Sequence, residues 1–240
     1  MRWRFVSYVT RLASIPVDRP FMPRAVLFDL DGTMLDTLPD LGYALNVALA
    51  SAHLPQHALP VVRGFIGHGV ATLIRRAVPA DLRDDHELHD NLRQRFDLAY
   101  AEVNGKFAQP YPGVDELLKW LQQQGLPCAC VTNKPDRFAR DLLRQFDLER
   151  YFAVVVGGDS PPRLKPHPDP ILLACERLAI APTQALMIGD SAADHAAARS
   201  AGARVLLVAY GYNEGPGVDT LDSDGVLGAM FDATAYIRGT

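Results

Sequence analysis

Short apolar runs recur along the chain, and each run ends in glycine or in polar residues. Runs of this kind are typical of strands that are buried on both faces of a parallel sheet. The five clearest runs are Ala25–Phe28, Pro127–Val131, Ala153–Val156, Ala185–Ile188 and Val205–Val208. We expect each run to form one strand of a single sheet.

Hydrophobic residues at helical spacing lie between most of these runs. One series begins at Val114 and is closed by Gly125, and a second begins at Ile171. Ser191 can cap a third helix, which runs through an alanine-rich stretch to Gly202. Strands that alternate with helices predict an α/β fold with a doubly wound, Rossmann-like parallel sheet.

The alternation is interrupted once, between the first and the second predicted strand. About 100 residues separate these strands, which is too many for a single crossover connection. Two amphipathic stripes begin in this interval at Leu41 and Val70, and a third helix is expected from Asp84 to Glu102. We therefore predict an inserted, small, all-helical cap. An insertion that is joined to a core by two chain segments can hinge, which suits a lid over a site.

These patterns divide the chain into an N-terminal extension (residues 1–23), a core (residues 24–37 and 110–240) and the cap (residues 38–109). The first 21 residues contain four arginines and one acidic residue. We expect the extension to be disordered or to reflect a start assigned too early, since Met22 stands shortly before the first strand. A mitochondrial targeting segment and an ordered arm are the alternatives.

Composition narrows the class of protein further. The chain has 240 residues, 48% hydrophobic and 22% charged, and these proportions exclude disorder, collagen and a coiled coil as the main state. A net charge of −4 gives no reason to expect a nucleic-acid partner, and no apolar run has the length of a membrane span. Three cysteines do not make a disulfide framework, so we expect reduced thiols and a cytoplasmic location. We expect a monomer or a homodimer.

Polar residues that can carry chemistry follow the predicted strands directly. Because ligands gather beyond the carboxyl ends of the strands of an open parallel sheet, these residues are expected to converge at one edge. In chain order they are Asp29 and Asp31, then Thr132 and Asn133, then Lys165, then Asp190 and Asp194. Each group alone is weak evidence of a site. Their order at four successive strand ends is strong evidence.

Several carboxylates at one edge repel one another, so a cation is the natural way to neutralise them. Oxygen ligands with open water positions favour Mg²⁺ over zinc. A magnesium ion, the Lys165 ammonium and the Thr132 hydroxyl make a good site for a phosphoryl group. One aspartate can then act as a nucleophile that forms an aspartyl-phosphate. A carboxyl two residues further on can protonate the leaving alcohol and then activate water. The pattern predicts a phosphatase that acts on a small phosphorylated metabolite.

At these residues the chain resembles the phosphatases of the haloacid dehalogenase-like (HAD-like) hydrolase superfamily. The resemblance extends over residues 24–211. It is carried by four motifs, which are Asp29–Thr33, Thr132 with Asn133, Lys165–Pro168 and Gly189–Asp194. The resemblance also implies a small cap after the first motif, which is where the helical insertion is predicted.

The resemblance implies a role for each motif residue. It implies that Asp29 is the nucleophile and Asp31 the general acid and base, and that Thr132 and Lys165 assist catalysis. Mg²⁺ would be held by Asp29, by the main-chain carbonyl of Asp31 and by Asp190, with Asp194 in support.

Within the superfamily the chain is similar to bacterial phosphoglycolate phosphatases. The shared features are Gly67–Gly69, Arg75 with Arg76, Lys165–Pro168 and Tyr210–Tyr212. They imply the hydrolysis of 2-phosphoglycolate to glycolate and phosphate. A phosphatase for a sugar phosphate such as N-acetylmuramate 6-phosphate, or a sugar phosphomutase, stays open because cap residues decide between them. A phospho-accepting or phosphate-binding regulator is the alternative that is not an enzyme.

Cap residues must supply substrate specificity. We therefore expect His68, which lies between two glycines, to contact the substrate together with Thr132, Asn133 and Lys165. Adjacent helix positions such as Arg75 and Arg76 point about 100° apart, so at most one of these two can reach the site. Lys134 is a weaker candidate than Lys165 for contact with phosphate.

Overall fold

The computed structural model describes residues 21–212 and 217–238, and its main feature is a six-stranded sheet whose neighbouring strands all run parallel. The strand order is β5-β4-β1-β6-β7-β8. The strands are β1 (Ala25–Phe28), β4 (Cys128–Val131), β5 (Phe152–Val156), β6 (Ala185–Gly189), β7 (Arg204–Val208) and β8 (Gly225–Leu227). The predicted parallel sheet is confirmed. The last strand was not predicted, because β8 contains only two apolar residues and its sequence does not form a recognisable apolar run.

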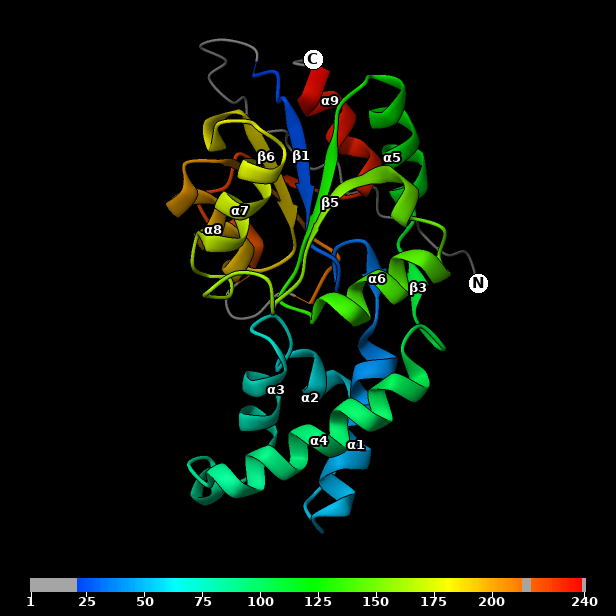
Figure 1. The fold of residues 1–240 in the computed structure, drawn as a ribbon, viewed down its shortest axis with the longest axis vertical. Helices are drawn as coiled ribbons and strands as arrows, with labels where there is room; N and C mark the ends of the chain where they lie inside the picture. Colours follow the sequence, from blue (N-terminus) through cyan, green and yellow to red (C-terminus); the bar gives the residue numbers. More distant parts are fainter. Residues whose placement is uncertain (1–20, 213–216, 239–240) are drawn as a thin grey trace, which may run out of the picture.

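Helices cover both faces of this sheet. Val26 and Phe28 of β1 belong to one apolar cluster, and Leu27 between them belongs to another, as expected for a strand whose side chains alternate. The first face carries α5 (Val114–Gln123), α6 (Asp136–Gln145) and α9 (Ala233–Arg238), and the second carries α7 (Asp169–Arg177) and α8 (Ala192–Ala201) (Figure 1). The sheet is therefore doubly wound, with its central strand fully buried.

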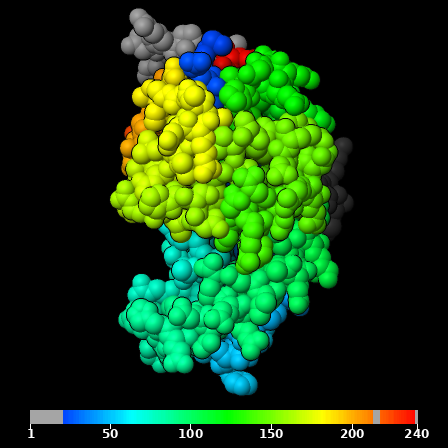
Figure 2. Space-filling model, in the orientation of Figure 1, coloured from blue at the N-terminus to red at the C-terminus, as the bar shows by residue number. Residues whose placement is uncertain are grey.

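Four further helices lie together beyond the carboxyl ends of the strands (Figure 1). They are α1 (Leu38–Ser51), α2 (Leu59–Arg63), α3 (Val70–Ala77) and α4 (His86–Val103). We call residues 38–103 the helical lobe and the rest of the described chain the sheet lobe. The helical lobe has an apolar cluster of its own, and in the space-filling view it forms a distinct body below the sheet lobe (Figure 2). The helix expected from Asp84 is α4, which Asp85 caps by accepting a hydrogen bond from the Leu88 N–H at 3.0 Å.

The chain crosses between the lobes twice, and the two crossings lie side by side. β2 (Leu35–Asp36) and β3 (Gln109–Pro110) form an antiparallel pair. Near the start of α1, the buried Asp40 carboxylate accepts hydrogen bonds from three main-chain N–H groups within residues 105–108, at 2.9–3.2 Å. The returning chain is therefore fixed to the outgoing chain. The cap boundaries that the sequence predicts stand next to this strand pair.

The remaining described elements are short. Single 3₁₀ turns occur at Ala80–Leu82, Glu149–Tyr151, Pro182–Gln184, Val218–Thr220 and Met230–Asp232. The three cysteines are buried free thiols. None of the helices in the described ranges has the length and apolar character needed to cross a membrane. Of the predicted N-terminal extension, residues 1–20 lie outside the described residues, whereas Phe21 is described and packs against the apolar cluster on the first face of the sheet.

Candidate active site

Three of the predicted carboxylates meet where β1 and β6 end. Asp29 follows β1 and Asp190 follows β6, and these strands are neighbours paired in register, so the two side chains stand next to each other. Asp194 joins them from the first turn of α8. One carboxylate oxygen from each of the three lies within 4.8 Å of the others, and all three residues are buried. Such a cluster needs positive charge to be stable in its ionised form.

Lys165 supplies one positive charge to this cluster. Its Nζ lies 2.9 Å from Asp29 Oδ1 and 2.6 Å from Asp194 Oδ1, and it donates a hydrogen bond to the main-chain oxygen of Val131 at 2.8 Å. Burial alone would lower the pKa of Lys165, but the Asp194 and Asp29 carboxylates raise it above its usual value. Lys165 is therefore a cation held in a fixed position, and its ammonium already contacts three protein oxygens.

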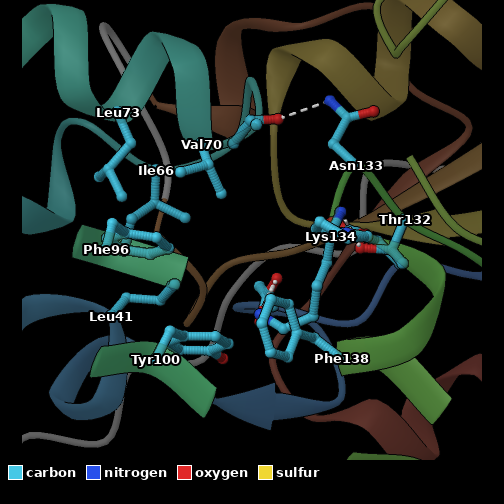
Figure 3. Close-up of a pocket in the computed structure, with 15 residues that line it drawn as sticks. Leu41, Ile66, Val70, Leu73, Phe96, Tyr100, Thr132, Asn133, Lys134 and Phe138 are labelled. Carbon is cyan, nitrogen blue, oxygen red and sulfur yellow. Dashed lines mark hydrogen bonds and ion pairs between the residues drawn. The ribbon is translucent and has the colours of Figure 1, made fainter. Parts of the chain in front are cut away.

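Asn133 holds the segment that carries Lys165. Its Oδ1 accepts the Lys165 N–H at 2.9 Å, and its Nδ2 donates to the Lys165 carbonyl at 2.9 Å. The same Nδ2 donates to the carbonyl of Gly67 in the helical lobe, also at 2.9 Å (Figure 3). Asn133 therefore ties together the Lys165 loop, the end of β4 and the helical lobe.

Asp194 uses both of its oxygens within the protein. Oδ1 meets Lys165, and Oδ2 accepts hydrogen bonds from the Ser191 hydroxyl at 2.6 Å and from the N–H groups of Ser191 and Asp190 at 3.1 and 3.3 Å. The Ser191 hydroxyl in turn accepts the Asp194 N–H at 3.2 Å, so this pair also caps α8 as predicted. Because both of its oxygens are engaged within the protein, Asp194 is better placed to orient Lys165 and Ser191 than to serve as a metal ligand.

Asp190 is held by residues far apart in the chain. Its Oδ1 accepts the Thr33 hydroxyl proton at 3.1 Å, and its Oδ2 accepts the Tyr212 N–H at 2.6 Å. Gly32 lies against the same carboxylate with a φ of +83°, and a side chain at this position would overlap Asp190. This turn after β1 therefore requires glycine for its backbone conformation and for space.

The cluster fits a divalent cation. Asp29 Oδ1 is buried, and within the described part of the chain its one close polar partner is the Lys165 ammonium at 2.9 Å. Burial is the main reason that the pKa of Asp29 rises to about 7, with repulsion from Asp194 adding to the effect and Lys165 opposing it. Burial, Asp194 and Asp29 likewise raise the pKa of Asp190 well above its usual value. Three carboxylates against one ammonium leave an excess of negative charge, which hard oxygen donors of this kind share with Mg²⁺.

The Asp31 carboxylate does not belong to this cluster and pairs with Lys134. Lys134 Nζ lies 2.7 and 2.9 Å from the two Asp31 oxygens, and the Thr37 hydroxyl donates to Asp31 Oδ1 at 2.6 Å. The Lys134 ammonium also stands over the ring of Tyr100 from α4, 4.8 Å from its centroid. Burial alone would lower the pKa of Lys134, but Asp31 raises it above its usual value.

A cavity opens between the two lobes at this place (Figure 3). The empty space at this place amounts to about 530 Å³ and includes open solvent. Its polar floor comes from the sheet lobe and consists of Asp29, Asp31, Thr132, Asn133 and Lys134. Its apolar roof comes from the helical lobe and includes Leu41, Ile66, Val70, Leu73 and Phe96. Tyr100 and Phe138 stand where floor and roof meet.

The other predicted site residues take different positions. Thr132 lines the floor, and its Oγ1 accepts the Lys134 N–H at 3.2 Å, which leaves its hydroxyl proton available. His68 is partly buried between two glycines that line the cavity but is not itself a lining residue. Arg75 pairs with Asp84 on the surface, and Arg76 donates to the Gly64 carbonyl.

Sequence reasoning missed Tyr100 and underrated Lys134. Tyr100 occupies a buried position of an amphipathic helix, where the hydrophobic pattern indicates core packing. Lys134 stands beside the second motif, which was a usable signal. Its pairing with Asp31 could be read only from the structure.

The chain matches the family model of haloacid dehalogenase-like hydrolases over residues 26–208. It is 41% identical over 221 residues to a phosphoglycolate phosphatase of Nitrosospira multiformis, covering 91% of this chain and 97% of that protein. It is 38% identical over 212 residues to a phosphoglycolate phosphatase of Nitrosococcus oceani, covering 88% and 94% respectively.

Solved structures agree with this family match. A crystal structure of a "predicted phosphoglycolate phosphatase" of Haemophilus somnus superposes with a TM-score of 0.83 at 34% identity. The superposition covers 88% of this chain and 96% of the other. The CbbY protein of Rhodobacter sphaeroides, solved with phosphate, gives a TM-score of 0.74 at 24% identity, covers 90% and 100% of the two chains, and shows a shared fold only.

Proposed function

This chain belongs to the haloacid dehalogenase-like hydrolase family, and we propose that it is a magnesium-dependent phosphatase that hydrolyses 2-phosphoglycolate through an aspartyl-phosphate. The reaction class, phosphoric monoester hydrolysis, follows from relatives at about 40% identity that are named for it. Our proposal adds three things to this reaction class, namely the metal Mg²⁺, the aspartyl-phosphate intermediate and the substrate 2-phosphoglycolate. The observation that carries them is the buried cluster of Asp29, Asp190 and Lys165 beneath the cavity.

The metal would be held by Asp29 and Asp190, with the main-chain carbonyl of Asp31 as a third ligand, and Asp194 would orient the cluster. Bound Mg²⁺ supplies positive charge that stabilises the oxygens of the transferring phosphoryl group. Lys165 and the available Thr132 hydroxyl proton add to this stabilisation from fixed positions. Asn133 keeps Lys165 in place through both of its amide atoms.

In the first step, an oxygen of the Asp29 carboxylate attacks phosphorus, and the bond from phosphorus to the leaving oxygen breaks. Asp31 gives its proton to that oxygen, so the alcohol leaves neutral. In the second step, Asp31 takes a proton from a water molecule that attacks the phosphorus of the aspartyl-phosphate. The bond between Asp29 and phosphorus breaks, phosphate leaves and both aspartates return to their starting states.

The cavity favours a small leaving group. Its roof is apolar over α1, α2–α3 and α4, and Lys134 is the one basic side chain among the lining residues of the described chain. A sugar would bring several hydroxyl groups against this roof, where they would have few partners. The relatives' name and this lining together support 2-phosphoglycolate over a sugar phosphate such as N-acetylmuramate 6-phosphate, and over a sugar phosphomutase.

The test is phosphate release from a panel of phosphomonoesters with Mg²⁺ and with a chelator. The panel holds 2-phosphoglycolate, N-acetylmuramate 6-phosphate, glucose 6-phosphate and a nucleoside monophosphate. We expect a strong preference for 2-phosphoglycolate that the chelator abolishes and Mg²⁺ restores. Weak release from every compound would overturn the proposed substrate. Release that persists in chelator would overturn the metal dependence, and conversion of glucose 6-phosphate to an isomer would point to a mutase.

A further inference from the structure

The leaving part of the substrate meets a different environment from its phosphoryl group. The phosphoryl group would lie beside Asp29, where Lys165 is already engaged by Asp29, Asp194 and the Val131 carbonyl. The rest of the substrate faces the apolar roof. A carboxylate placed there without a partner would lose its hydration with no compensation, at a large cost in binding free energy.

Lys134 is the basic group that such a carboxylate can reach. It lines the cavity, its side chain is 3% exposed, and its ammonium has Asp31 on one side and the Tyr100 ring on another. No basic residue of the described chain other than Lys134 lines the cavity.

Tyr100 offers a second group at the same point. Its hydroxyl is buried beside the Lys134 ammonium, and within the described chain it makes no hydrogen bond of good geometry. An ammonium can only donate, so the hydroxyl proton has no acceptor there, which costs free energy unless a ligand supplies one. Lys134 and Tyr100 come from different lobes, so a group that binds both also joins the lobes.

We propose that Lys134 and the Tyr100 hydroxyl bind the carboxylate of the substrate's leaving group, which takes the place of Asp31 on Lys134. This inference rests on the proposed function, since it assumes a substrate with a carboxylate. Lys134 is then a specificity-determining residue, and binding of the correct substrate releases Asp31 from its ion pair with Lys134.

The exchange leaves no charged group without a partner. Asp31 keeps the hydrogen bond from the Thr37 hydroxyl at 2.6 Å, and its side chain is 14% exposed, so water can reach it. Lys134 exchanges one carboxylate for another and keeps its contact with the Tyr100 ring. The Tyr100 hydroxyl donates its proton to the incoming carboxylate, which supplies the acceptor that it lacks.

The test compares two substrates of similar size. One is 2-phosphoglycolate, and the other is 2-hydroxyethyl phosphate, in which a neutral alcohol replaces the carboxylate. We measure kcat/KM for both with Mg²⁺ in the full-length wild type, in Lys134→Met and in Lys119→Met as the control. Lys119 is an exposed lysine of α5 that lies outside the cavity lining.

Lys134→Met also removes the partner of Asp31, so the informative quantity is the ratio of the two kcat/KM values. We expect this ratio to fall about 100-fold in Lys134→Met, which is the effect of removing one member of a buried charge pair, and to stay unchanged in Lys119→Met. An unchanged ratio in Lys134→Met would overturn the inference, because Lys134 would then act only through Asp31.

Tyr100→Phe provides an independent variant that keeps the ring and the packing of α4. We expect the same ratio to fall about 10-fold, because only the hydrogen bond to the carboxylate is lost. An equal change for both substrates would remove Tyr100 from the proposal. A wild type that hydrolyses other phosphomonoesters but not 2-phosphoglycolate would overturn the proposed function itself, before any variant is compared.

Discussion

The floor and the roof of the cavity differ in their chemistry and in how they are held. Directly beneath the floor, Lys165, Asp190 and Asp194 each have at least two partners within the sheet lobe, and several of these partners are main-chain atoms. The roof is made of apolar side chains that belong to the separate core of the helical lobe. The lobes meet there through a few polar contacts, such as Asn133 with Gly67 and Lys134 with Tyr100. In the proposed mechanism, bond making falls to side chains that several partners hold in place, and substrate choice falls to the roof together with Lys134 at its edge.

Removal of the nucleophile tests the floor most severely. Asp29→Asn should lower kcat by about 10⁴-fold or more, because an amide oxygen does not form the covalent intermediate. The fold should persist, since the change relieves repulsion within the carboxylate cluster. Phosphate release and thermal melting measure the two effects, with the exposed Asp81→Asn as a control. Normal turnover in Asp29→Asn would contradict the covalent mechanism.

The stability of the metal-free protein should depend on pH through the floor. The pKa of Asp29 is about 7 in the fold against an ordinary 3.8, so between these values the folded state binds a proton that the unfolded state has lost. Asp29 should therefore make the free energy of unfolding fall as pH rises from about 4 to about 7, by about 4 kcal/mol, and Asp190, whose pKa is also raised, should add to this fall. Urea denaturation at several pH values measures this slope. Asp29→Asn should reduce it, and an identical slope in that variant would assign the effect to other groups.

Removal of the fixed cation should affect stability as well as catalysis. Lys165→Met leaves Asp29 and Asp194 buried without their ammonium, which should lower the free energy of unfolding by about 3 kcal/mol near neutral pH. Added Mg²⁺ should restore part of this loss by binding the same carboxylates. Denaturation with and without Mg²⁺ gives both values, and Lys119→Met is the matched control. A variant as stable as the wild type would show that the cluster is not ionised at that pH.

The smallest effect is expected from the roof. Val70→Thr replaces a methyl group by a hydroxyl at a partly buried position of the lining, with little change in shape. We expect kcat to be unchanged and KM for 2-phosphoglycolate to change by about threefold at most, since roof contacts bind ground state and transition state alike. Val47→Thr, on the exposed face of α1, controls for the substitution. A large fall in kcat would contradict the comparison, because it would show that a roof residue takes part in the chemical step.

The residues that follow the strand ends could be predicted from the sequence, and the side chains of the helical lobe that meet them could not. Asp29, Thr132 and Asp190 each stand next to a strand end, so the parallel order of the strands is enough to bring them together. Tyr100 lies more than sixty positions from Asp31 in the chain, on a helix whose pattern predicts only that the residue is buried. Its contact with Lys134 depends on how the two lobes pack, which no local spacing encodes.

Partner choice within the floor was equally hidden. The sequence places Asn133 near phosphate, whereas the structure shows its amide fixing Lys165 and meeting Gly67. Amide side chains can serve as substrate ligands or as internal braces, and only the surrounding main chain decides between these uses. The third predicted strand pointed to Lys165, but the three oxygens that surround its ammonium could be read only from the structure.

The adjacent crossings at β2 and β3 have a consequence for the descent of this molecule. Because Leu35–Asp36 pairs with Gln109–Pro110, everything between them leaves and re-enters the sheet lobe through a gap of one strand spacing, about 5 Å. Two chain ends at that separation can be connected by a two-residue hairpin or by a bundle of helices. During evolution, one insertion between β2 and β3 could be exchanged for another without a change in the register of β1, β4 or β6. Replacement of the helical lobe could thus change the substrate while the residues at the strand ends of the sheet lobe were inherited unchanged.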